Sequence, residues 1–284
     1  VSADGSVIVG GAAFDRPQLP DIEITRQATN DDSDPVLRAF IWRTEMQDLE
    51  NLMLSFPILA NDTEIAVAQQ QNTVGRLMDV TCLADAGQSC LRVDGWLSNT
   101  GSTSGDNIDK RSSQSAILTY GRGLDGQTTL GGTLSINGTD LNNNGFDMSS
   151  AAGISLWAEY SETGLARTGW QAGAALGWSE GSGDISRGRG LENVMISAGE
   201  ADMSTTGVSA TLGYGFQQQD WLLSPSLSLA HFETRRDGYA ETGGDFNAAY
   251  DGLSTSRTTM TLELDAGRKV AEVGSLLLGA GFEH

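Results

Sequence analysis

The sequence predicts an all-β fold, an antiparallel transmembrane β-barrel with an N-terminal helix in its lumen. From residue 91 onward, apolar side chains recur at every second position, which is the period of a strand with one apolar face. The alternate positions hold mostly Gly, Ser, Thr and Ala, small residues that suit the inner wall of a barrel. Before these runs, residues 62–80 contain one Gly and no Pro, as expected of a helix.

The composition narrows the classes of protein that the chain can represent. The 284 residues include 37 acidic and 17 basic side chains, a formal net charge of −20. Binding to nucleic acid needs a surplus of Lys and Arg on one face, so we predict no nucleic-acid partner. No apolar run approaches the roughly 18–20 residues of a membrane-spanning helix, and no signal peptide is visible. Neither absence excludes a β-barrel, because a transmembrane strand needs only about 9–11 residues that are apolar at alternate positions.

Residues 1–61 are predicted to be partly irregular and to form a segment separate from the barrel. They hold one strand-like run, SVIVGGA at 6–12, and an acidic stretch with a proline, RQATNDDSDPVL at 26–37. The run AFIWRTEMQDLENL at 39–52 follows. The hydrophobic pattern changes from one run to the next, so it predicts no single helix or strand over these residues.

Residues 62–80, DTEIAVAQQQNTVGRLMDV, are predicted to form a helix in the barrel pore. Asp62 or Thr63 supplies an N-cap before Glu64. Polar residues dilute the apolar face too much for a large dry core, so the helix requires a polar groove. The alternative is a linker helix packed outside the sheet. The residues predicted to face polar lumen side chains are Gln69, Gln70, Gln71, Asn72 and Arg76.

Cys82 and Cys90 are the two cysteines of the chain. Their spacing does not match a CxxC metal or redox site, and no second pair exists to complete a zinc site. We predict a small disulfide loop, which requires an oxidising compartment such as the periplasm or the cell exterior. Two separate thiols in a reduced protein are the alternative.

Residues 81–284 are predicted to form the barrel itself. About nine strand-like runs alternate with turns rich in Gly, Asp, Asn and Ser. Short connections at 123–128 and 162–167 contrast with long acidic ones at 181–204 and 232–256, as the two ends of an outer-membrane barrel do. A β-sandwich, whose outer face is bulky and charged, fits these runs less well. The alternation is clearest at 170–178, 208–216, 260–266 and 276–282.

Side chains on the two faces of the sheet have different predicted roles. Aromatic residues near strand ends are predicted to form interfacial girdles, and these are Trp96, Tyr120, Trp157, Tyr160, Trp170, Trp178, Tyr214 and Trp221. Charged residues at inward positions are predicted to line the lumen and to pair across it with Arg76. These are Arg92, Asp94, Glu159, Glu263 and Asp265.

The polar helix followed by amphipathic strands resembles the translocator β-domain of autotransporters, the type V secretion family, over about residues 62–284. The stretches LTYGRGL, SATLGYGF and LLLGAGFEH are similar to strands of that family. The resemblance implies a barrel of about twelve strands, threaded by a helix that joins it to an exported passenger. It also implies a place in the bacterial outer membrane, with the passenger at the cell surface. The implied partners are outer-membrane lipid, the passenger and the outer-membrane barrel-assembly machinery, and no cofactor is expected.

Residues 1–50 carry a second resemblance. VSADGSVIVGGA, together with AFIWRTEMQDLENL, is similar to part of a HAF-type extracellular repeat of autotransporter passengers. Residues 1–61 would then be the end of the passenger. The family ends on a strand with a terminal aromatic residue, whereas this sequence ends Gly281-Phe282-Glu283-His284. About three further strands are therefore expected beyond His284.

No motif for catalysis or metal binding stands out. The sequence lacks GxSxG and HExxH, so we predict no enzyme activity. Some members of the resembled family cleave the passenger at an asparagine of the pore helix; Asn72 is the candidate in this sequence, but the paired asparagines are absent. DLNNNGFD at 140–147 lacks the closing Glu of a calcium loop, so we predict no metal site. The predicted function is outer-membrane export and anchoring of a passenger, and the alternative is a secreted soluble β-rich adhesin or binding module.

Overall fold

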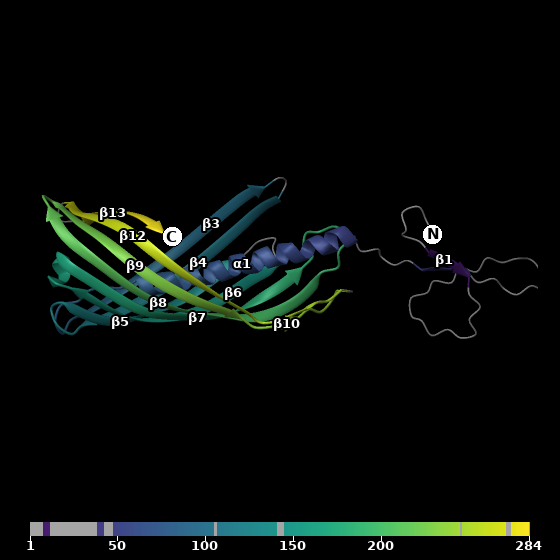
Figure 1. Ribbon diagram of the computed structural model, residues 1–284, viewed down its shortest axis with the longest axis horizontal. Helices are drawn as coiled ribbons and strands as arrows, with labels where there is room; N and C mark the ends of the chain where they lie inside the picture. The colour runs from purple at the N-terminus through teal and green to yellow at the C-terminus, as the bar shows by residue number, and fades with distance from the viewer. Residues whose placement is uncertain are drawn as a thin grey trace, which may run out of the picture.

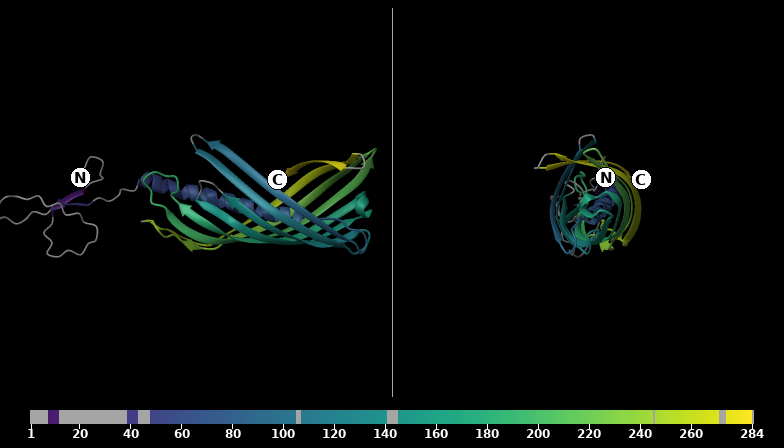
Figure 2. Two further views of the ribbon diagram at one scale, coloured as in Figure 1. Left: turned by 180° about the vertical axis from the view of Figure 1, so that it is seen from behind. Right: turned by 90° about the vertical axis from the view of Figure 1, so that its left-hand side faces the viewer.

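A computed structural model of the chain shows one long helix lying along the concave face of a curved sheet (Figure 1). The structure describes residues 8–11, 39–42, 48–104, 107–140, 145–244, 246–270 and 274–283. Seen end on, the sheet curls around the helix (Figure 2). The helix is therefore inside the curve of the sheet and not packed on its outer face.

Nine antiparallel strands form the main sheet, which confirms the predicted fold class and the number of strand-like runs. Each strand pairs with its neighbour in sequence, as in an up-and-down barrel. Among the described residues, the first and last strands of this sheet are its two edges, so the curve is open. The strands are β3 (Ser89–Ser104), β4 (Asn107–Gly123), β5 (Thr128–Asp140), β6 (Phe146–Ser161), β7 (Gly169–Arg187), β8 (Ser197–Gln218), β9 (Trp221–Arg236), β12 (Leu253–Val270) and β13 (Gly274–Glu283).

The two longest connections of the main sheet lie at the same end of it. The end that we call the turn end has the connections 124–127, 162–168 and 219–220, the second of which contains the short helix η1 (Gly164–Ala166). The end that we call the loop end has 188–196 and 237–252, and the latter carries a hairpin of β10 (Tyr239–Ala240) and β11 (Ala249–Tyr250). The long loops predicted at 181–204 and 232–256 are therefore partly wrong, because both stretches are largely strand.

Two short strands precede the helix. β1 (Ile8–Gly11) pairs antiparallel with β2 (Ala39–Trp42), so four residues of the strand-like run at 6–12 and the first four residues of the run at 39–52 are strand. The rest of residues 1–47, and with it most of the HAF-like repeat, lies outside the described residues. The centre of the calcium-like stretch, residues 141–144, also lies outside them.

Helix α1 (Leu49–Asp79) is much longer than the predicted helix. Its 31 residues span about 46 Å at the usual rise per residue. The predicted start at residue 62 is wrong: the N-cap is Asp48, whose side chain accepts from the backbone N–H groups of Glu50 and Asn51. Pro57 lies inside the helix, although proline interrupts the helical hydrogen-bond ladder. No helix among the described residues is long and apolar enough to cross a membrane.

The convex face of the sheet is apolar, as the period of two predicts. Leu156 of β6 lies opposite Leu176 of β7, and Leu212 of β8 lies opposite Leu227 of β9, with all four side chains exposed. A continuous exposed apolar face is unfavourable in water and is expected where a barrel meets hydrocarbon. Other exposed side chains of this kind are Leu91, Val93, Leu118, Leu134, Met260, Leu262 and Leu278.

The predicted aromatic girdles are right for five residues and wrong for two. Tyr120, Tyr160, Trp170, Trp178 and Tyr214 are exposed, while Trp221 is only half-buried. Trp157 is instead 4% exposed and lies inside the curve, and Trp96, although 44% exposed, lies against Arg76 of the helix. Both tryptophans occupy inward positions of their strands, so proximity to a strand end did not decide the direction of the ring.

Candidate functional site

The site is the channel formed by the concave face of the sheet, together with α1, which fills part of it. The helix begins at the loop end, where the backbone N–H of Asp48 donates to the carbonyl of Asn193 (2.8 Å). It ends near the turn end, where residues Val80 to Ala84 meet β4 and β5. The chain therefore passes along the channel from one end to the other before it enters β3.

Glycines on the concave face make room for the C-terminal half of the helix. Val74 is fully buried, and a Cβ atom at Gly177 or at Gly207 would come within 2.9 Å of its Cγ1 atom. A Cβ at Gly153 would lie still closer to Leu77 Cδ1. These separations are shorter than van der Waals contact, so a larger residue at any of the three positions would force the helix side chains to shift.

The loop-end half of the concave face is apolar, which differs from the predicted small polar wall. Phe146, Ile185 and Met203 are buried there, in one cluster with Leu59 and Val67 of the helix. Strands in this half extend beyond the convex apolar belt, and their inward side chains form a dry core with the helix. The channel is therefore packed at the loop end, and farther along it holds a second apolar cluster of Val74, Met78, Trp157, Ala175 and Phe232 beside a polar cavity.

Two of the predicted pore-helix residues are buried and bonded to strands. Gln70 Nε2 donates to Ser179 Oγ (3.1 Å), and Gln71 Nε2 donates to Thr234 Oγ1 (3.2 Å). Nearer the start of the helix, the buried Asp62 carboxylate accepts from the backbone N–H of Gly145 (2.9 Å). Buried polar groups of a helix need such partners, and the strands and their connections supply them.

The other three predicted pore-helix residues lie in different surroundings. Gln69 is half-buried beside β5 and β6. Asn72 is exposed, and its Oδ1 accepts from Arg257 Nη1 (3.2 Å). The guanidinium carbon of Arg76 lies 3.8 Å from the ring centroid of Trp96, a cation–π contact.

A polar cavity of about 780 Å³ lies between α1 and the strands β6, β7, β8, β9 and β12. Glu159, Glu263 and Asp265, three of the predicted lumen residues, line it. Glu159 also accepts a hydrogen bond from Thr81 Oγ1 (3.0 Å). The remaining two, Arg92 and Asp94, form an ion pair with each other on β3 (2.8 Å).

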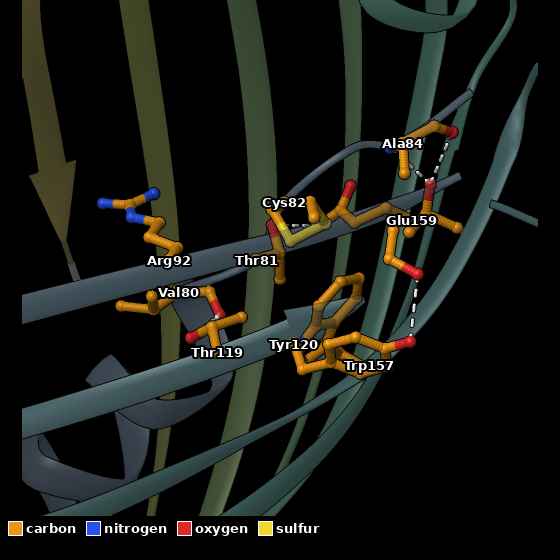
Figure 3. Close-up of a disulfide and its surroundings, with 12 residues drawn as sticks. Val80, Thr81, Cys82, Ala84, Arg92, Thr119, Tyr120, Trp157 and Glu159 are labelled. Atoms are coloured by element: carbon orange, nitrogen blue, oxygen red, sulfur yellow. Dashed lines mark hydrogen bonds between the residues drawn. A yellow bond between two sulfur atoms is a disulfide. The ribbon is translucent and has the colours of Figure 1, made fainter. Parts of the chain in front are cut away.

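Strand hydroxyls cap the C-terminal end of the helix (Figure 3). The last carbonyls of a helix lack partners within it. Ser155 Oγ donates to the carbonyl of Leu77 (2.7 Å), and Thr133 Oγ1 donates to that of Val80 (3.1 Å). Trp157 Nε1 donates in turn to Thr133 Oγ1 (3.1 Å), so the buried indole supports this cap.

The predicted disulfide is confirmed: Cys82 and Cys90 are bonded and link the end of the helix to the start of β3 (Figure 3). The bonded sulfurs pack over Gly121, where a Cβ would lie 2.9 Å from Cys90 Sγ. A loop this short is expected to gain about 2–3 kcal/mol from its cross-link. The disulfide therefore fixes where the chain leaves the channel and begins the sheet.

Sequence reasoning missed Arg187 and misplaced Trp157. Arg187 falls in the stretch predicted to be loop, but it is the last residue of β7 and is buried. Counting by twos from the inward Ala175 would have placed it on the inner face. A charged residue at such a position requires a partner from another segment.

Comparisons with known proteins agree with this arrangement. A family model described as the autotransporter beta-domain matches residues 91–284. The translocator domain of the autotransporter NalP from Neisseria meningitidis has a similar structure, with a TM-score of 0.63 and 16% identity over 80% of this chain and 78% of that one. The β-domain of the Bordetella autotransporter BrkA gives a TM-score of 0.52 and 18% identity over 70% of this chain and 81% of that one. No curated protein matches the sequence.

The family match covers more than half of the chain, and the solved structures share its curved sheet. The exposed apolar convex face is the surface that such a domain presents to lipid. The chain belongs to the autotransporter β-domain family and is a translocator domain of the bacterial outer membrane, which exports a passenger to the cell surface.

Proposed function

We propose that α1 is the pore segment by which the passenger stays joined to the barrel. The observation that carries this proposal is the path of the helix, which follows the channel from the loop end to the turn end and is bonded to strands along the way. Long connections lie outside the cell in outer-membrane barrels. A passenger that precedes Asp48 then emerges at the outer surface and stays anchored there.

Within this proposal, the predicted site residues have two roles. Gln70 and Gln71 hold the helix against β7 and β9, while Asn72 and Arg76 line the polar cavity and Gln69 lies beside β5 and β6. The predicted lumen charges, Arg92, Asp94, Glu159, Glu263 and Asp265, keep the channel hydrated. A hydrated wall of small polar residues leaves room for an extended chain in transit.

We also propose the divisions and partners that the resemblance implies. The sequence placed the end of the HAF-type passenger at residue 61 and the pore helix at 62–80; because α1 begins after Asp48, we propose instead residues 1–47 for the passenger end, 48–80 for the pore segment and 81–284 for the barrel. The outer-membrane barrel-assembly machinery is the partner that inserts the strands, and nucleic acid is not a partner. The net charge of −20 supports the last point.

The experiment that tests the function uses the full-length protein with an epitope tag in the passenger, expressed in a bacterial host. We expect the tag to be accessible to antibody on intact cells, and the β-domain to fractionate with the outer membrane. Unheated samples should migrate differently from heated ones on a gel in mild detergent, because a closed sheet resists the detergent. Full solubility without detergent would contradict the proposal and support a secreted β-rich adhesin.

We propose further that the domain has no enzyme activity, including passenger cleavage at Asn72. The side chain of Asn72 is exposed and accepts from Arg257, and the lumen carboxylates lie on β6 and β12. Replacing Asn72 by Ala is therefore expected to leave the size and amount of the processed passenger unchanged on a blot of the full-length protein. Accumulation of uncleaved precursor in Asn72→Ala, with cleavage retained in Asn51→Ala, would overturn this proposal.

A further inference from the structure

One buried arginine joins four segments of the chain at the loop end of the channel. Arg187, the last residue of β7, is 1% exposed, and its Nε donates to both carboxylate oxygens of Glu241 (2.9 and 3.1 Å). Its Nη1 donates to Ser55 Oγ of α1 (3.1 Å), and its Nη2 donates to Ser197 Oγ at the start of β8 (3.3 Å). Nη2 also donates to the carbonyl of Phe246.

The partner carboxylate is as fully bonded as the guanidinium. Glu241 is in the 237–252 connection, and its side chain in the ion pair is 0% exposed. It also accepts from the backbone N–H of Ala248 (2.9 Å) and from the hydroxyl of Tyr250 (3.2 Å). Burial and the nearby carboxylate raise the pKa of the Tyr250 phenol, which keeps its proton available for this bond.

The network depends on the helix being in place. Ser55 supplies one acceptor to the guanidinium, and the ring of Phe56 lies 4.4 Å from its central carbon. The second loop-end connection also contacts the helix, because Asn51 Nδ2 donates to the carbonyl of Glu192 (3.0 Å). Both connections therefore lie against the first two turns of α1.

A chain in transit and this network exclude one another. The apolar cluster of Phe146, Ile185 and Met203 packs against the helix at this end, and the ion pair lies over the helix near its start. An extended passenger segment in the same place would separate Arg187 from Glu241. An isolated charge would then be left in a dry site, which is strongly unfavourable.

We propose that Arg187 and Glu241 form a latch that closes the outer mouth of the channel once the helix has reached its final position. This proposal rests on the proposed role of α1 as the pore segment. It gives a conformational role to two residues that were not among the predicted site residues. Arg187 is a positioning residue: it holds the 237–252 connection over Ser55 and does not contact the passenger. The structure shows the state in which the ion pair is formed.

The test compares the full-length protein with its Glu241→Gln variant, purified in detergent from the outer membrane. Three backbone amides report opening of the connection by hydrogen exchange: that of residue 241 donates to the carbonyl of Ala248, that of Thr242 to the carbonyl of Ala198 on β8, and that of Ala248 to Glu241 Oε2. We expect exchange on the order of 100-fold faster or more in Glu241→Gln, because one buried charge is left without its partner. Conductance across a planar lipid bilayer should rise in the same variant.

Three further variants make the test specific. Glu233→Gln is the matched control, because it removes the acid of an exposed Arg235–Glu233 pair on β9 (2.7 Å) and should change neither measurement. Arg187→Met with Glu241→Gln removes both charges and should exchange more slowly than Glu241→Gln alone. Ser55→Ala removes only the bond to the helix and keeps the test possible where Glu241→Gln does not fold; it should raise exchange less.

The outcomes separate the latch from the translocation function. Parental exchange rates in both Glu241→Gln and Ser55→Ala would overturn the latch, and so would faster exchange without a rise in conductance. Surface exposure of the passenger tag is scored separately on intact cells of the parent strain. If the unmodified protein folds and its amides are protected but its passenger is not displayed, the proposed translocation function is contradicted and the latch is not.

Discussion

Replacing both Gly177 and Gly207 by valine is expected to abolish the folded, heat-modifiable form of the protein. The two glycines lie directly opposite one another on β7 and β8. A Cβ at either position would approach Val74 Cγ1 to 2.9 Å, and Val74 is a β-branched residue with little rotamer freedom. Overpacking of this kind costs about 1–3 kcal/mol per site, and valine adds two further methyl groups beyond Cβ. The helix would have to move away from the channel wall at these two strands.

The measurement is the fraction of full-length protein with altered gel mobility before heating, together with the display of the passenger tag. Gly95→Val is the control, because a Cβ there meets nothing within 4 Å. Adding Val74→Ala to the double variant removes the methyl groups that both valines meet and should restore part of the folded fraction. A double variant that folds and displays its passenger like Gly95→Val would show that the helix does not need these glycines.

The period of two predicted the sheet well because it needs only local information. A strand with one face in hydrocarbon must alternate, so Leu156, Leu176, Leu212 and Leu227 identify the convex face without knowledge of their neighbours. The same alternation left glycine on the opposite face. The prediction that small residues on the inner face make room for a helix is correct at Gly153, Gly177 and Gly207.

The loop-end half of the fold was not predictable in the same way. There the strands extend past the apolar belt of the convex face. Their outward positions carry charged residues such as Glu200 and Asp202, so the apolar side chains lie on the inner face and not on the outer one. The inward Ala201 and Met203 are buried only because the helix reaches them. Sequence periodicity therefore underestimated the length of the strands.

The early start of α1 has a related cause. Pro57 and the mixed residues before Asp62 disfavour a helix locally. The structure stabilises that half through contacts with distant segments, namely Ser55 with Arg187 and the Asp62 carboxylate with Gly145. Tertiary contacts between residues so far apart in sequence leave no signal in a single sequence.

Trp157→Ala is expected to cost about 3–5 kcal/mol of stability, the usual range for a buried large aromatic side chain. The indole is 4% exposed and lies over Gly121 and Gly131, where added Cβ atoms would clash with the ring. The substitution would leave a cavity between the ring's neighbours, and the Thr133 hydroxyl that caps the helix would lose its donor. Unfolding in urea, followed by gel mobility of the full-length protein in detergent, gives the difference.

Two comparisons identify the cause of that loss. Trp157→Phe keeps most of the ring but removes the N–H that donates to Thr133, so about 1 kcal/mol of the loss should belong to the hydrogen bond. Trp178→Ala removes a tryptophan from the adjacent strand that is 42% exposed on the convex face, and its effect should be much smaller. Equal losses for Trp157→Ala and Trp178→Ala would mean that the indole of Trp157 contributes through lipid contact, as the girdle prediction assumed. A larger loss for Trp157→Ala would mean that the indole stabilises the protein by packing inside the channel, next to the end of the helix.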